Sequence, residues 1–61
     1  MTIDKIKHYM GEFLFNHWSS VTDETIIKKA IELLEQELKS GLLVGIKYEA
    51  ELKFLKYRAG V

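Results

Sequence analysis

Cysteine and proline are both absent from this 61-residue chain. A chain without cysteine forms no disulfide and offers no thiolate to zinc, so we expect a reducing compartment and predict a cytoplasmic location. Proline interrupts helices because its backbone nitrogen carries no hydrogen to donate, and this chain contains no such residue. The strongest remaining breaks, residues 19–20 and 40–41, divide the chain into three segments.

Long apolar runs and an excess of one charge are lacking as well. The longest apolar runs, residues 13–15 and 42–44, fall far short of the roughly 18 residues of a transmembrane helix, so we expect no membrane association. The N-terminal residues alternate charged and apolar side chains, which is not the pattern of a signal peptide. Nine basic and nine acidic residues balance, so no overall field draws the molecule to nucleic acid.

What the chain does contain is apolar side chains, at 48% of its residues. This fraction is typical of a folded protein and too high for a disordered one. We therefore expect one helical domain over residues 1–61. A core of this size is marginal, and small proteins often complete such a core with a second subunit.

The first segment predicts a helix over residues 3–18. Ile3, Ile6 and Met10 begin an apolar stripe at three- and four-residue spacing, and Thr2 is a suitable N-cap. A second stripe contains Phe15 and Trp18. Two large aromatic side chains therefore lie away from the first apolar face.

The second segment predicts a helix over residues 23–39. Thr22 is the expected N-cap, and Ile27, Ile31 and Leu34 form part of the inward stripe. Gly41 supplies the left-handed residue that ends the helix. We expect this helix to pair with the first one as an antiparallel helical hairpin.

The third segment fits two structures. From Val44 to Phe54 apolar residues alternate with Gly45 and with charged residues, which is the period of a strand, but no other segment offers a strand to pair with. Read as a helix over residues 43–58, it is apolar on two sides. We predict an all-α, three-helix fold. The alternative is an α+β fold in which residues 43–54 form a strand paired with another chain.

A helix with two apolar faces requires cover on both, and a three-helix domain of this length is expected to cover only one. We therefore predict a homodimer or a protein partner on the other face. Large apolar side chains anchor such interfaces. The predicted interface residues are Phe15, Trp18, Tyr48, Leu52 and Leu55.

The sequence shows no arrangement typical of catalysis, and we predict no enzymatic activity, no catalytic residue, no cofactor and no metal site. His8 and Glu12 are one helical turn apart but provide only two ligands, and His17 is expected to pack at the edge of the core. Ser19 and Ser20 lack a nucleophile motif and are interpreted as turn residues. Glu49 and Glu51 are expected to be solvated charges.

One local feature is typical of nucleic-acid binding. Lys53, Lys56 and Arg58 lie beside Tyr57 near the C-terminus, and cations with an interleaved aromatic suit a phosphate backbone. A nucleic-acid-binding protein is therefore the alternative hypothesis. The leading hypothesis is a small protein–protein interaction module, a regulator or inhibitor that docks through an apolar helical surface.

Overall fold

The computed structural model describes residues 2–60, and in that range the fold is all-α without strands. The helices are α1 (Ile3–Met10), α2 (Glu12–Ser20), α3 (Glu24–Ser40) and α4 (Ile46–Ala59). The predicted all-α class is confirmed, and the alternative strand over residues 43–54 is wrong. Residues 43–45 lie in the connection, and the helix-favouring sequence that follows needs no pairing partner to satisfy its backbone.

The predicted count of three helices is wrong because the first one breaks at Gly11. This residue has φ 87° and ψ 150°, a conformation that costs glycine little because it has no Cβ. The apolar stripe continues through Gly11, so the pattern gave no sign of the break. The predicted N-cap is confirmed, since the Thr2 hydroxyl accepts a hydrogen bond of 3.3 Å from the Lys5 amide.

Helix α3 begins one residue later than its predicted cap implied. The Asp23 carboxylate, instead of the Thr22 hydroxyl, accepts a 2.9 Å hydrogen bond from the amide of Thr25. The predicted end is confirmed. Gly41 adopts the left-handed conformation with φ 83°, and its amide donates to the Leu38 carbonyl.

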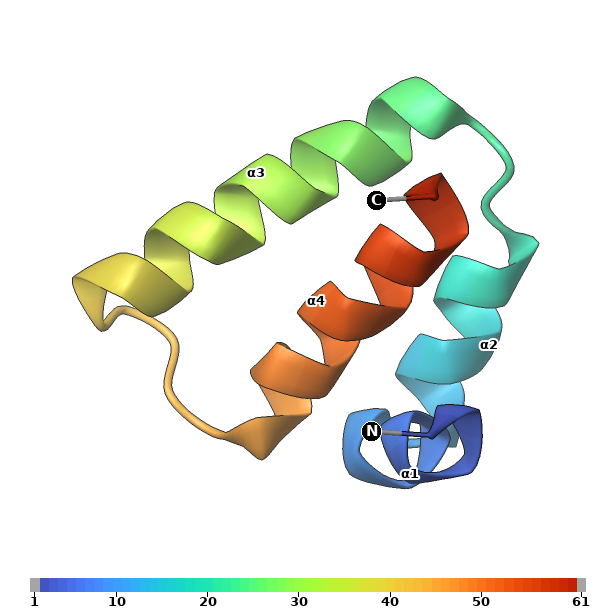
Figure 1. Cartoon of the computed structure of the whole chain (residues 1–61), viewed down its shortest axis with the longest axis horizontal. Helices are drawn as coiled ribbons and strands as arrows, with labels where there is room; N and C mark the ends of the chain where they lie inside the picture. The colour runs from blue at the N-terminus through green and yellow to red at the C-terminus, as the bar shows by residue number, and fades with distance from the viewer. Residues whose placement is uncertain (1, 61) are drawn as a thin grey trace.

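Helix α4 is the centre of the molecule. Figure 1 shows it between α3 on one side and α1 with α2 on the other, and it contacts each of these helices. The predicted hairpin of the first two segments is wrong. In the described chain neither α1 nor α2 lies alongside α3, and the antiparallel hairpin is formed by α3 and α4.

Two apolar clusters hold α4 in place. The first consists of Ile6, Met10, Ala50 and Phe54. The second consists of Ile27, Ile31, Leu34 and Leu55. Burying each large side chain contributes about 1.5–3 kcal/mol. The two apolar faces of α4 thus pack against α1 and α3 of the same chain. Ile46 and Tyr57 of α4 stay exposed.

Candidate functional site

The α3–α4 hairpin carries two open hollows along one side. The first has a volume of about 400 Å³ and is lined by Lys28, Ile31, Glu35, Lys56 and Ala59. The second has a volume of about 410 Å³ and is lined by Leu38, Glu49, Leu52, Lys53 and Lys56. Lys56 lines both hollows, so they adjoin. Together these nine residues define the α3–α4 groove.

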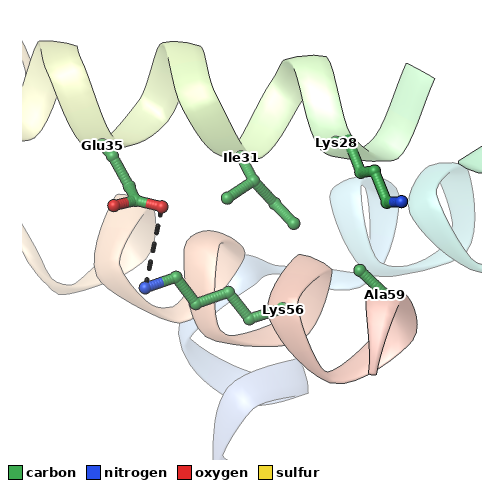
Figure 2. A pocket seen from close by; sticks show the side chains of 5 residues that line it. All are labelled: Lys28, Ile31, Glu35, Lys56 and Ala59. Atoms are coloured by element: carbon green, nitrogen blue, oxygen red, sulfur yellow. Dashed lines mark ion pairs between the residues drawn. The ribbon is translucent and has the colours of Figure 1, made fainter. Parts of the chain in front are cut away.

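The groove has an apolar floor and a charged rim. Figure 2 shows Ile31 pointing from α3 into the space above α4, with Lys28 and Glu35 on either side of it. The Lys56 ammonium lies 3.7 Å from a Glu35 carboxylate oxygen, and both side chains are about half exposed. An ion pair this exposed contributes only about 0–1 kcal/mol, so a ligand could separate it at little cost.

Two matching stripes of the sequence build the groove. Lys28, Ile31, Glu35 and Leu38 occur on α3 at spacings that place them along one edge of its buried face. Glu49, Leu52, Lys56 and Ala59 repeat the same spacing on α4. Each stripe alternates charged and apolar residues, and the two run in opposite directions. Each stripe therefore contributes both apolar and charged side chains to the groove.

The predicted interface residues do not form one surface. Leu52 lines the groove, and Tyr48 is partly buried on α4. Phe15 and Trp18 are partly buried on α2, and the Phe15 ring lies 4.8 Å from that of Phe54. Leu55 has no exposed surface at all. Only Leu52 of this set is therefore both in the groove and accessible to a partner.

Trp18 has a specific partner inside the molecule. Its indole N–H donates a 2.8 Å hydrogen bond to a carboxylate oxygen of Glu51, whose side chain is buried. The interpretation of Glu51 as a solvated charge is wrong, whereas Glu49 is exposed as expected. In the sequence Glu51 resembles a surface residue because it lies in a run of helix-forming residues. Its hydrogen-bond donor, the Trp18 indole, is brought to it only by the packing of α2 against α4.

The predicted nucleic-acid residues are divided between two sides of α4. Lys53 and Lys56 line the groove. The Arg58 guanidinium instead donates 2.7 Å hydrogen bonds to the backbone carbonyls of Trp18 and Val21. It thereby satisfies acceptors at the end of α2 and in the link to α3. The three cations do not make one basic patch.

The remaining polar candidates lie on the surface. His8 and His17 are both exposed, and the centre of the His17 ring lies 4.9 Å from that of Trp18 in an edge-on arrangement. The interpretation of Ser19 and Ser20 as turn residues is wrong, because both belong to the last turn of α2, where the Ser20 hydroxyl donates to the His17 carbonyl at 2.7 Å. Residues 2–60 contain no group of three or more His, Asp or Glu side chains placed to hold a metal ion.

Across residues 2–60, none of the helices has the length and the apolar character needed to cross a bilayer.

Comparison with protein-family models, with curated proteins and with solved structures finds no match to this chain.

Proposed function

We propose that this protein is a small, non-enzymatic protein–protein interaction module that binds an amphipathic helix of another protein in the α3–α4 groove. The observation that carries the proposal is the groove itself, which is open and has apolar side chains beside the two buried core clusters. An apolar groove between two helices suits the apolar face of a third helix.

The size of the groove indicates the length of the partner segment. From Lys28 to Leu38 the α3 axis covers about 15 Å, at 1.5 Å per residue. A partner helix of about three turns matches this length. It would place apolar residues at i, i+3, i+4 and i+7 on the groove floor.

The rim indicates the charge of the partner. Lys56 pairs with Glu35, whereas Lys28 and Lys53 make no ion pair within residues 2–60. Across the groove three lysines face two glutamates. A partner helix with carboxylates beside its apolar stripe would therefore complement the rim, and such complementarity favours association and fixes orientation.

A domain that binds a helix of its partner and so makes that helix inaccessible to other proteins suits a regulator or an inhibitor. We propose a cytoplasmic location because the chain has no cysteine. Self-association stays a prediction, which sedimentation equilibrium over a wide concentration range would test. In the single chain α1 and α3 already cover much of the apolar surface of α4, which weakens the argument for self-association through that helix.

The test uses a synthetic helical peptide of about 14 residues with Leu at i, i+3, i+4 and i+7 and Glu beside them. Titrated into labelled protein, it is expected to shift the backbone NMR signals of the groove residues. Lys28→Glu is expected to weaken binding about 5- to 10-fold through like-charge repulsion. Lys29→Glu is the matched control because Lys29 is exposed on α3 but does not line the groove.

Three results would count against the proposal. Signal changes centred away from the groove would place the binding surface elsewhere, and equal effects of the two lysine substitutions would remove the role of the rim. Salt-dependent binding of an oligonucleotide through Lys53 and Lys56, with no binding of the peptide, would favour the nucleic-acid hypothesis instead.

A further inference from the structure

The junction of α1 and α2 combines features of a bent and of a straight helix. Gly11 separates the two helices, yet its amide still donates to the Lys7 carbonyl at 3.0 Å, and the Phe15 amide still donates to the Gly11 carbonyl at 3.0 Å. Figure 1 shows α1 end-on and α2 from the side, so their axes diverge sharply. Gly11 therefore keeps both of its own helical hydrogen bonds although the helix axis changes direction there.

The bent junction leaves backbone donors without protein acceptors. The amides of residues 12–14 make no backbone hydrogen bond in the described structure, and α2 has no side-chain cap. In a continuous helix these three amides would donate to the carbonyls of residues 8–10. Straightening the junction would therefore recover three hydrogen bonds that the bent form lacks.

Phe13 supports the same conclusion from the side-chain pattern. Its position continues the stripe of Ile6 and Met10 at i, i+4 and i+7, which would share one face of a straight helix. In the bent form Ile6 and Met10 are buried, whereas Phe13 is 84% exposed. Because of the bend, the Phe13 ring lies outside the core. In a continuous helix it would lie on the same face as Ile6 and Met10.

Packing of α1 against α4 compensates for these costs in the single chain. Ile6 and Met10 cover Ala50 and Phe54, and Lys7 lies 5.2 Å from the centre of the Phe15 ring. In a straight helix Lys7 and Phe15 would be about 12 Å apart along the axis, and α1 would leave its own α4. The α1 of a second copy could then cover the same surface.

We propose that this chain also forms a domain-swapped dimer, in which residues 3–20 are one continuous helix and α1 packs on Ala50 and Phe54 of the second copy. The α1–α4 contacts are the same in both forms, apart from the chain to which α1 belongs. The balance between monomer and dimer is therefore set mainly by the Gly11 hinge. This interface is separate from the α3–α4 groove.

Gly11→Ala tests the proposal by sedimentation equilibrium. Alanine disfavours the positive φ of the bend and favours a helix, so each hinge shifts the equilibrium roughly tenfold and the two hinges of a dimer roughly 100-fold. The dimer dissociation constant is expected to fall by that factor. Gly60→Ala is the matched control, because Gly60 also has positive φ, at 77°, but lies at the end of α4.

The contacts inside the dimer identify the exchanged element. In a mixture of isotope-labelled and unlabelled Gly11→Ala chains, magnetisation transfer between the Met10 methyl group and the Phe54 ring is expected to occur between chains. Contacts that stay within one chain would overturn the swap. A folded Gly11→Ala monomer at all concentrations, or equal dimerisation of Gly60→Ala, would overturn it too.

If Gly11→Ala does not fold, the wild-type chain provides the test. Refolding from denaturant at millimolar concentration is expected to yield a slowly dissociating dimer with the same interchain contact between Met10 and Phe54. A purely monomeric product would refute the proposal. Lys28→Glu is expected to leave this dimer unchanged, so failure of the groove hypothesis and failure of the swap are distinguishable.

Discussion

The hydrogen bond between Trp18 and Glu51 links the short helix α2 to the centre of the fold, and Trp18→Phe removes it. The indole donor lies 2.8 Å from a carboxylate that is only 8% exposed. Removing a hydrogen bond to a charged group of this kind costs about 1.5–3 kcal/mol, because the buried acceptor is left without its partner.

This loss is large for so small a protein. At roughly 0.05–0.15 kcal/mol per residue, a chain of this length is stabilised by about 3–9 kcal/mol. A decrease of about 2 kcal/mol would lower the melting temperature by about 8–16 °C. The assay is urea unfolding followed by far-ultraviolet circular dichroism, because the substitution removes the only tryptophan and with it the fluorescence signal.

A double variant separates the hydrogen bond from the change in ring size. Trp18→Phe combined with Glu51→Leu leaves neither a buried acceptor nor a donor without its partner. It is expected to be about 1–2 kcal/mol more stable than Trp18→Phe alone. Glu49→Leu serves as the control, since Glu49 is an exposed carboxylate on the same helix. Two results would refute the reasoning. One is a decrease in the free energy of unfolding below about 0.5 kcal/mol for Trp18→Phe, and the other is an effect of the double variant equal to the sum of the effects of Trp18→Phe and Glu51→Leu measured singly.

Two further pairs of substitutions test the fold with the same unfolding assay. Phe54→Ala is expected to lower the free energy of unfolding by about 3–5 kcal/mol, whereas Phe13→Ala should change it by less than about 0.5 kcal/mol, because the first side chain is 4% exposed and the second 84%. Equal losses would contradict the placement of α1 against α4. Asp23→Ala is expected to cost about 1 kcal/mol by removing the N-cap of α3, and Thr22→Ala almost nothing. The reverse order would restore Thr22 as the cap.

The individual helices were largely predictable because their signals are local. Spacing of apolar residues identified the buried faces of α3 and the two faces of α4, and Gly41 marked the end of α3 correctly. The break at Gly11 was missed because the apolar stripe runs through it without interruption. Of the groove, Lys53, Lys56 and Leu52 were singled out from the sequence, but as members of two unrelated surfaces.

The sequence by itself determined that the chain is helical, that helices begin after Thr2 and end at Gly41, and which residues of α4 are apolar, since these follow from spacing and capping within a few residues. Only the tertiary structure decided what covers each face of α4. Packing of α1 and α3 on opposite sides of α4 depends on the bend at Gly11 and on contacts between residues about 20 to 50 positions apart. The same packing buries Glu51 against Trp18, turns Arg58 toward the end of α2 and leaves the α3–α4 groove open. Long-range contacts of this kind are set by the fit of whole helices to one another, which no local pattern encodes.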